Sequence, residues 1–597
     1  MYGARKVGGA GRLRVELLET IPEDRDLRAG WNALALQMEH PEVFYTYEWA
    51  LAVQRAYSAS LKPLVFLGYE GELLIGIAAL ARKGSGEVMF LTADTGDYCD
   101  FLSDRPKRQE FVQAVLSKLN DSRAGKIVLT NLPADSVTSK ALEAGAQRAG
   151  YHLHSRPAYD CAQVVLGSSE EREELKQSVL AKKRLRRNMR ELTKRGKVTL
   201  QHDTAWSQIE PLLQTFCRAH AARFLETGKV SSLVREERRT FLAELARELS
   251  PSGWVALSRF VVGDVTTAWN YGFRFAGSWF WYQPTVNGRY WDFSPGYCLL
   301  AKIVEQACDM PEFKLVDLGL GAEGYKDRFA TASRRTLYCE LHRGVLPHLY
   351  AAGRYRAAAL ATASARIEKA IRLVISRARQ LKERLREGGW GSLFARALRR
   401  IRRTLFSAED VFFFQWPADA SPHEPSSTRL RPLDPDDLGA AAIHYADDTA
   451  AMRFLMRSAD RLLSGKALGF VLVTPEGLPV HFCWAREFEG FHMAELDRTL
   501  RAPSKDAMMI FDCFTPVSAR GHGFFSEAIT ILGKQLRAQG KDPWIFGAST
   551  NLSSVNGIRK TPFAYKFSLG RRKILFFRQA KDSVPAAPAT ETPVSVS

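Results

Sequence analysis

The chain has 597 residues, of which 46% are hydrophobic, 11% aromatic and 25% charged. This composition allows large buried cores and excludes a protein that is disordered over most of its length. The formal net charge is +19, from 84 basic and 65 acidic residues, and favours an anionic partner such as a phosphorylated cofactor, a nucleic acid or an acidic membrane.

The beginning of the sequence does not have the pattern of a secretory signal. Met1–Arg14 is basic and glycine-rich and holds no apolar stretch. No run in the sequence approaches the roughly 20 apolar residues that a membrane-spanning helix needs. We therefore expect a cytoplasmic protein with a disordered start at 1–12. At roughly 150 residues per domain, the length predicts three or four domains.

The first folded region, 13–160, alternates strand-like and helix-like runs. Two strands, Pro63–Tyr69 and Leu73–Arg82, flank a Glu-Gly-Glu turn, which predicts a β-hairpin. A helix over Gln109–Leu119 and a strand over Lys126–Asn131 follow. This order favours an α/β domain that begins with antiparallel strands.

The second region, 161–346, repeats this plan with more helix at its start. A long helical stretch, Glu170–Arg195, precedes two further predicted helices. Three successive strand-like runs between Trp254 and Pro284 come next, and a helix over Tyr297–Asp309 follows. This order predicts a second mixed α/β module.

The third region, 347–416, is a predicted helical connector with a strongly basic composition. Across 353–405 there are 15 Lys and Arg residues against 3 acidic residues. A linker rich in Pro, Ser, Ala and Asp at 417–427 separates this connector from a last α/β domain, 428–580. The tail, 581–597, is rich in Pro, Ala, Thr and Val and is expected to be disordered.

Two interpretations of the basic connector remain open. Its arginines flank an apolar stripe that includes Trp390 and Phe394, a pattern typical of a helix lying on an anionic membrane. The same stripe fits a helical hairpin whose apolar face packs on neighbouring domains. A nucleic-acid partner is not expected, because no recognisable RNA- or DNA-binding fold accompanies the charge.

The eight cysteines predict no metal site. None belongs to a Cys-x-x-Cys pair, and metal-ligand spacing is absent. Apolar neighbours, as around Cys217 and Cys298, indicate free buried thiols. No metal cofactor is therefore expected.

A strand, a glycine loop and a helix follow one another in the last domain. The strand Met508–Phe514 leads into a loop with Arg520, Gly521 and Gly523. Glycines let the backbone approach an anion, and the N–H groups in the first turn of a helix can bind it. We therefore predict that these three residues bind a phosphorylated cofactor; the alternative is an ordinary turn whose glycines only allow tight packing.

At these residues the chain resembles the GNAT acetyltransferase superfamily, whose acyl-CoA loop follows Arg/Gln-x-x-Gly-x-Gly/Ala. Phe525 stands where that pattern has a small residue. Downstream, Asn551 matches a second cofactor position of the family, whereas Ile558 stands where many members carry a general-acid tyrosine. The resemblance implies an acyl-CoA module without the usual acid.

A second set of candidate residues lies in the second region. Ser294 and Gly296 flank Pro295 at a predicted helix start, where N–H groups can hold a phosphate or a carbonyl. Glu323 lies on a glycine-flanked loop and is a candidate base for an attacking amine or hydroxyl. Tyr282 is the candidate acid for a leaving thiolate, and Lys326 a candidate contact for an anionic donor or substrate.

Several of these features also have a purely structural interpretation. Glu323 would then only pair with Lys326 or Arg328. His220, a further catalytic candidate on a predicted helix, would cap or pack. The basic run Lys182–Arg190 is either an anion-binding surface or a solvated helix face.

Together these residues resemble the double-GNAT proteins of the cellulose-biosynthesis type (CelD/BcsL), and more distantly the FemAB-type peptidyltransferases. In that group a basic helix precedes a helical His, a Ser-Pro-Gly turn and an Asp-x-x-x-Gly-x-Glu-x-Tyr-Lys segment, here Asp317–Lys326. The resemblance covers 13–345. The first region has the usual opening of the group: Trp31, Phe44, Glu48, Trp49, Asp97, Tyr98, Asp100 and Phe101.

The resemblance implies an α/β fold with mixed sheets, built from tandem GNAT-like modules that the basic connector joins to a third. The implied activity is an N- or O-acyltransferase that moves an acetyl or other acyl group from acyl-CoA to an amine or hydroxyl in polysaccharide or cell-envelope biosynthesis. Two alternatives are a FemAB-like transferase that uses aminoacyl-tRNA and a non-catalytic scaffold of a membrane-associated synthase. In one interpretation, 353–405 contacts the inner membrane peripherally.

Overall fold

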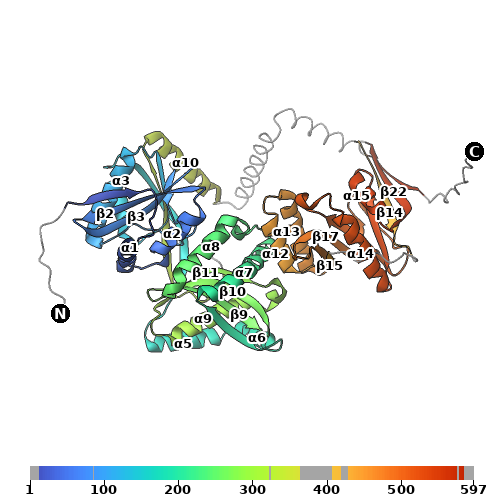
Figure 1. Cartoon of the computed structure of the whole chain (residues 1–597), viewed down its shortest axis with the longest axis horizontal. Helices are drawn as coiled ribbons and strands as arrows, with labels where there is room; N and C mark the ends of the chain where they lie inside the picture. The colour runs from blue at the N-terminus through green and yellow to red at the C-terminus, as the bar shows by residue number, and fades with distance from the viewer. Residues whose placement is uncertain are drawn as a thin grey trace, which may run out of the picture. The chain divides into compact units, whose positions relative to one another are not determined.

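The computed structural model describes residues 12–84, 86–321, 324–362, 406–417, 428–574 and 577–583. The chain divides into two compact units: unit 1 comprises 1–220 with 232–363, and unit 2 comprises 221–231 with 364–597 (Figure 1). None of the helices in the described ranges has the length and apolar character that crossing a membrane requires.

The N-terminal half of unit 1 (blue in Figure 1) begins with antiparallel strands. The predicted hairpin is confirmed as β2 paired with β3, from Leu61 opposite Lys83 to Glu70 opposite Leu73. The elements are β1 (Arg14–Leu18), α1 (Arg25–Gln37), η1 (Val43–Tyr45), α2 (Tyr47–Ala56), β2 (Leu61–Glu70), β3 (Leu73–Lys83), β4 (Val88–Phe90), β5 (Leu102–Ser103), η2 (Arg105–Lys107), α3 (Arg108–Asp121), β6 (Lys126–Pro133), α4 (Val137–Gly145) and β7 (His152–Val165).

The C-terminal half of unit 1 contains more helix, as the sequence predicts. The elements are α5 (Ser169–Leu180), α6 (Lys183–Thr193), β8 (Val198–Asp203), α7 (Trp206–Glu226), η3 (Ser232–Val234), α8 (Glu236–Leu249), η4 (Ser250–Ser252), β9 (Val255–Val262), β10 (Val265–Phe275), β11 (Ser278–Val286), η5 (Gly288–Phe293), α9 (Pro295–Asp309), β12 (Leu315–Asp317), η6 (Lys326–Arg328), β13 (Ala332–His342) and α10 (Val345–Thr362).

The single long helix expected over Glu170–Arg195 is instead two helices. Lys182 has an extended backbone between α5 and α6. The break lets Val179 of α5 and Leu185 of α6 enter the same hydrophobic core, to which α9 contributes most of its length. Packing against α9 therefore overrides the helical preference of the sequence at this point.

The two halves of unit 1 share one mixed sheet. Its strand order is β1-β2-β3-β4-β6-β13-β7-β12-β11-β10-β9-β8. β13, the last strand of the second half, lies between β6 and β7 of the first half and pairs antiparallel with both. The domain boundary expected at 160/161 falls inside β7. The halves are therefore interlocked through β13.

Each half contains one parallel strand pair joined by a crossover helix. In the first half, α3 connects β4 to β6; in the second, α9 connects β11 to β12. The neighbouring strands are antiparallel. The expected α/β class with a mixed sheet is thus confirmed.

Unit 2 repeats this arrangement, with α14 joining the parallel strands β20 and β21. Its sheet has the order β15-β16-β17-β20-β21-β14-β22-β23. The elements are β14 (Phe406–Gln415), β15 (Arg429–Pro432), α12 (Pro435–His444), α13 (Thr449–Ser464), β16 (Leu468–Val473), β17 (Pro479–Glu487), β18 (His492–Met493), β19 (Arg498–Thr499), β20 (Ala507–Phe514), η7 (Val517–Ala519), α14 (Phe524–Ala538), β21 (Asp542–Ala548), α15 (Leu552–Arg559), β22 (Ala564–Ile574) and β23 (Phe577–Ser583).

Strand β14 lies in the segment that was expected to be a helical connector. It pairs with β21 and β22, and Val411 and Phe413 are fully buried. The fold of unit 2 thus includes residues before the Pro-rich linker. The expected helices over 363–405 lie outside the described residues, and β23 extends to Ser583, into the expected disordered tail.

Candidate functional site

The candidate site lies where β11 and β12 separate. These parallel strands pair from Ser278–Phe280 to Leu315–Asp317. On its other side, β11 remains paired with β10 as far as Val286. Among the described residues, the edge of β11 beyond Phe280 therefore faces no paired strand, and its backbone groups point toward the chain that follows β12.

The helix between these strands begins beside the basic helix α6. Ser294 precedes α9 in the left-handed conformation, with φ 46°. Its Oγ accepts a hydrogen bond of 2.9 Å from the exposed guanidinium of Arg184 in α6. Gly296 follows in the first turn, where an added Cβ would lie 2.9 Å from Val286. A cation, a hydroxyl and a helix start are thus together, a combination suited to a phosphate.

A loop from the N-terminal half reaches the point where β11 and β12 separate. The hydroxyl of Tyr98 donates a hydrogen bond of 2.8 Å to Asp317, the last residue of β12. Asp317 also accepts from the backbone N–H of Gly319, at 2.8 Å. Gly319 has φ +71°, and an added Cβ there would lie 2.6 Å from Oδ2 of Asp97. The close approach of Asp97 therefore depends on glycine at 319.

Asp97 is a titratable group at this junction. Burial raises its pKa to about 7, and the neighbouring carboxylate of Asp317 adds to the increase. Lys326 and the backbone N–H of Leu320 oppose it. Asp317 is 1% exposed, whereas Asp97 is only partly buried, so Asp97 is the carboxylate that solvent or a substrate can reach and can exchange a proton near neutral pH.

Tyr282 of β11 lies on the same junction but has partners within the protein. Its hydroxyl donates to the backbone carbonyl of Thr95 and accepts from Arg238 of α8 at 2.6 Å. Burial raises the pKa of Tyr282 well above its usual value. Nε and the second terminal nitrogen of Arg238 are buried without a hydrogen-bond partner among the described residues. A thiolate acceptor for Tyr282 would have to replace the Thr95 carbonyl.

The other predicted catalytic side chains are His220, Lys326 and Glu323. His220 is 3% exposed; burial first, and the charge of Arg238 second, lower its pKa to about 4, so it is neutral at pH 7. Lys326 is 5% exposed and its ammonium donates to the carbonyl of Leu320 at 2.9 Å. Glu323 lies outside the described residues. Arg238 thus contacts Tyr282 directly and acts on His220 through its charge, whereas the ring of His220 hydrogen-bonds Gln283; the charge of Lys326 acts on Asp97.

The corresponding helix start in the N-terminal half is already filled. Arg108, at the start of α3, is fully buried. Its guanidinium donates to the carbonyl and the hydroxyl of Ser103 and lies 3.9 Å from Asp100. The side chain of the protein itself therefore occupies this position, and the first half contributes its 92–100 loop to the junction instead.

In unit 2 the glycine loop before α14 is open on one side. Gly521 and Gly523 have φ of +87° and +82°, and no heavy atom lies within 4 Å of a Cβ placed on either. Arg520 is exposed, and its Nε donates to the carbonyl of Thr515 at 3.2 Å. This loop keeps the backbone geometry that an anion-binding turn requires.

Asn551, which matches the family pattern, and the two departures from it, Ile558 and Phe525, all have structural roles in unit 2. Asn551 caps α15, because its side chain accepts from the N–H of Ser554 at 3.2 Å. Ile558 is fully buried in the core. The ring of Phe525 lies 2.5 Å from where a Cβ on Gly557 would stand, so it fills the contact between α14 and α15. Cofactor contacts of Arg520, Gly521, Gly523 and Asn551 stay predictions.

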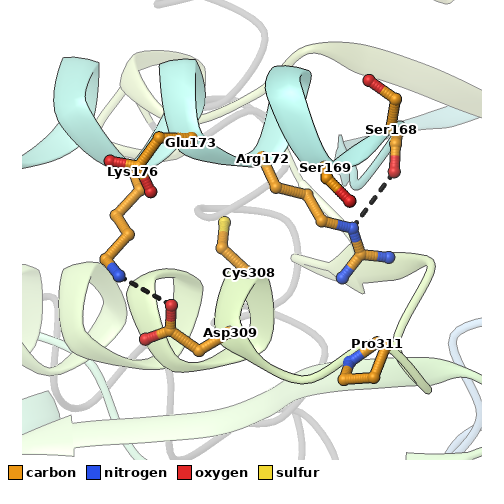
Figure 2. A pocket seen from close by; sticks show the side chains of 9 residues that line it. Ser168, Ser169, Arg172, Glu173, Lys176, Cys308, Asp309 and Pro311 are labelled. Carbon is orange, nitrogen blue, oxygen red and sulfur yellow. Dashed lines mark hydrogen bonds and ion pairs between the residues drawn. The ribbon is translucent and has the colours of Figure 1, made fainter.

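A pocket of about 400 Å³ lies away from these residues, between the start of α5 and the end of α9 (Figure 2). Lys176 and Asp309 form an ion pair of 2.6 Å across it. Arg172 donates to the carbonyls of Met310 and Phe313 at 3.1 and 2.6 Å. The two cations of this pocket, Arg172 and Lys176, are thus engaged in joining α5 to the end of α9.

The sequence patterns do not indicate two candidate site residues, Asp97 and Arg238. Asp97 was noted only as part of a family opening, and Arg238 was not singled out. Both act through contacts between residues more than 40 positions apart, which spacing cannot indicate. Over the described part of the chain, no group of three or more His, Cys, Asp or Glu is arranged to hold a metal ion.

Residues 181–327 match the family described as acetyltransferase (GNAT) domain. The match begins at α6 and ends in η6, so it contains Arg184, Tyr282, Ser294 and Lys326. The segment similar to a GNAT acetyltransferase domain therefore makes up most of the C-terminal half of unit 1. No curated protein matches the chain.

Solved structures similar to this chain include the following three. FemX is 11% identical, with TM-score 0.39 over 54% of this chain and 97% of that chain. A tandem GNAT protein from the clavulanic acid biosynthesis pathway is 10% identical, with TM-score 0.33 over 56% and 99%. The C-terminal domain of a putative lysylphosphatidylglycerol synthetase from Agrobacterium fabrum is 9% identical, with TM-score 0.37 over 55% and 94%. These likenesses carry no argument about function, and none names the CelD/BcsL type.

Proposed function

We propose that unit 1 is a GNAT-type acyltransferase that moves an acyl group from acyl-CoA to an amine or a hydroxyl where β11 and β12 separate. The observation that carries this proposal is the helix start at Ser294, which Arg184 contacts directly beside the unpaired edge of β11. It lies within the segment that matches the GNAT domain.

Donor binding follows from the charges at the start of α9. The pyrophosphate of CoA is an anion, and both the N-terminal end of a helix and a guanidinium stabilise it. Ser294 and Gly296 bring the backbone close, and Arg184 supplies the charge-assisted hydrogen bond. The thioester then lies along β11, where a backbone N–H stabilises the developing oxyanion.

The transfer needs one proton acceptor and one proton donor. The acceptor nitrogen or oxygen attacks the thioester carbonyl, the C–S bond breaks, and the CoA sulfur leaves with the electron pair. Asp97 takes the proton of the attacking group, since a pKa of about 7 suits a general base at neutral pH. Glu323 is the second candidate for this role. Tyr282 and Lys326 remain the candidates for protonating and orienting the leaving group.

Two buried groups favour an acceptor that carries an anionic or carbonyl group. Two guanidinium nitrogens of Arg238 make no hydrogen bond of good geometry with the described residues, and Tyr57 is the other side chain that interacts with this guanidinium. A buried unpaired donor is costly, and a substrate oxygen would remove that cost. His220, held neutral by burial and by the charge of Arg238, is hydrogen-bonded to Gln283 and would contribute to the substrate site through its second ring nitrogen. The setting in polysaccharide or cell-envelope biosynthesis is proposed on the sequence resemblance alone.

Acyl transfer by the full chain tests this proposal. Arg184→Ala should lower kcat/KM for acetyl-CoA by about 10-fold or more, because a charge-assisted hydrogen bond is lost. Arg186→Ala is the matched control, since Arg186 is exposed on the same helix and donates to the carbonyl of Ala181. Equal activity of the two variants would contradict the donor site, and no thiol release with any amine or hydroxyl acceptor would contradict the activity.

An aminoacyl-tRNA donor is the second candidate, favoured by the run of exposed cations on α6. Phosphate contacts make nucleic-acid binding fall steeply with salt. Binding of tRNA at about 50 mM salt that is lost at about 200 mM, together with no affinity for acetyl-CoA, would support this donor instead. The A-form backbone would then lie along Lys183, Arg186 and Arg187, which are exposed.

Unit 2 is proposed as a second donor-binding module or as a scaffold of a membrane-associated synthase. Its open loop at Gly521 and Gly523 supports the first role, and Ile558, in place of an acid, supports the second. The affinity of the Arg520→Ala variant for acetyl-CoA distinguishes the two roles, because only a donor-binding module would lose affinity. Peripheral membrane contact through 353–405 stays a proposal based on its charge.

A further inference from the structure

Helix α10 packs on β7 and β13 with a polar and aromatic face. The ring of Tyr355 stacks on that of His154, with centroids 5.1 Å apart. The ring of His348 lies 5.7 Å from that of His152, and Ala351, between them on the helix, is 3% exposed. The inward face of α10 therefore carries imidazole and phenol rings around one alanine.

The outward face of α10 carries large apolar side chains. Leu346 is 79% exposed and Tyr350 74%, and their neighbours Val345 and Leu349 are also more than half exposed. Positions i, i+1, i+4 and i+5 lie on one side of a helix, so these side chains form one continuous apolar face. An ordinary surface helix turns its apolar side chains inward and its polar ones to solvent, and α10 does the opposite. Such an exposed apolar face is typical of a surface that binds a partner.

The described charged residues of the segment that carries this face are all arginines, and the nearby carboxylate of Glu340 is buried in β13. Arg343, Arg354 and Arg356 are exposed. From Arg343 to Ile367 the sequence contains no Asp or Glu. An apolar helix face bordered by arginines, with a tyrosine among its apolar residues, is the composition of a helix that lies in the interface of an anionic membrane.

We propose that the outer face of α10, formed by Val345, Leu346, Leu349 and Tyr350, binds an anionic phospholipid surface. The apolar side chains enter the headgroup region, and the three arginines contact lipid phosphates. α10 does not have the length and apolar character that crossing a bilayer requires, and we therefore propose a peripheral contact. This inference does not rest on acyl transfer. It deepens the proposed membrane contact of the basic connector, because Leu349, Tyr350, Arg354 and Arg356 lie in the part of 347–416 that the structure describes.

Charge disfavours the two other occupants of this face. A second copy of the chain would bring Arg343, Arg354 and Arg356 against the same three arginines, and like charges repel. The segment of this chain that follows, 363–405, is itself strongly basic, so it does not complement them either. An anionic surface complements all three.

Sedimentation of the full chain with lipid vesicles tests the proposal. We expect at least about 10-fold stronger partitioning to phosphatidylcholine vesicles with about 30% phosphatidylglycerol than to phosphatidylcholine alone. The double variant Leu346→Glu/Tyr350→Glu should lose at least about 10-fold of this partitioning, because it removes apolar contact and adds negative charge. Leu73→Glu is the matched control, since Leu73 is 66% exposed in the β2–β3 turn.

Circular dichroism and the thermal midpoint of each variant establish that it is folded, which is expected for residues this exposed. Weak binding of the wild type to both vesicle types would overturn the proposal. Equal binding of the double variant and the wild type would also overturn it, and would assign the binding to other cations. A wild-type dimer that the double variant converts to a monomer would assign the face to a second copy instead.

Discussion

Gly319 is a residue at which the backbone and the site depend on each other. Its φ of +71° lies in the left-handed region, and Asp97 approaches to 2.6 Å from a Cβ placed on it. An L-residue with a side chain is strained at such a φ, and here the side chain would also displace Asp97. The position of Asp97, beside the point where β11 and β12 separate, therefore depends on Gly319 having no side chain.

Gly319→Ala should destabilise unit 1 by about 1–3 kcal/mol and lower acyl transfer, because Asp97 must move. Gly324→Ala in the same segment is the control, since no atom lies within 4 Å of a Cβ there and its φ is not positive. Urea unfolding measures the first effect and thiol release the second. If the Gly319→Ala variant were as stable and as active as Gly324→Ala, the close approach of Asp97 to Gly319 would not be needed for stability or activity.

The raised pKa of Asp97 makes a definite prediction for stability against pH. As pH rises from about 4, the unfolded carboxyl ionises while the folded one keeps its proton up to about 7, so stability falls over this range and the loss is constant above it. Asp97→Asn removes this contribution. Relative to the wild type, the variant should gain stability progressively from pH 4 to 7.

Urea unfolding midpoints of both proteins between pH 4 and 8 measure this difference. Asp317, whose pKa burial also raises, is present in both proteins and cancels in the comparison if its environment is unchanged. A difference that does not vary with pH, or that shrinks as pH rises, would contradict the raised pKa of Asp97.

At the scale of elements, β13 joins the two halves of unit 1 through a buried ion pair. Arg334 lies 2.6 Å from Glu42 and over the ring of Tyr98, whose hydroxyl contacts Asp317. Burial raises the pKa of Glu42 well above its usual value, and the charge of Arg334 opposes this. One arginine on the last strand therefore stabilises a carboxylate and the loop that forms the site.

Arg334→Met should cost about 3–5 kcal/mol, because it leaves Glu42 buried without its cation. Arg335→Met, on the same strand, should cost at most about 1 kcal/mol, since Arg335 and its partner Asp160 are more than half exposed. Equilibrium unfolding in urea compares the two. The double variant Glu42→Gln/Arg334→Met should be more stable than Arg334→Met alone. If the losses of stability in Glu42→Gln and Arg334→Met simply add up in the double variant, the two side chains are not directly paired.

The elements that the sequence predicted well are those with a strong local pattern. The β2–β3 hairpin and the helix α9 follow from alternation, turn residues and helical spacing. The break at Lys182 and the strand β14 did not, because each depends on distant partners: α9 for the break, and β21 and β22 for the strand. Tertiary packing decided both against local preference.

At the scale of the whole molecule, the part of the chain that the structure describes contains one arrangement three times: a parallel strand pair with a crossover helix between its strands. The three helix starts differ. Arg108 fills the first, Arg184 contacts Ser294 at the second, and glycines open the third. The sequence indicated the second and third starts through Ser294 and Arg520. It did not indicate Asp97, because that residue reaches the site only when the two halves share a sheet.

Equilibrium binding of acetyl-CoA to the full chain, measured by titration calorimetry, tests the central claim that the start of α9 holds an anionic donor. The account predicts binding by the wild type and by Arg186→Ala, and an affinity at least about 10-fold lower for Arg184→Ala. Unchanged affinity of Arg184→Ala, or no binding by the wild type at any practical concentration, would contradict it.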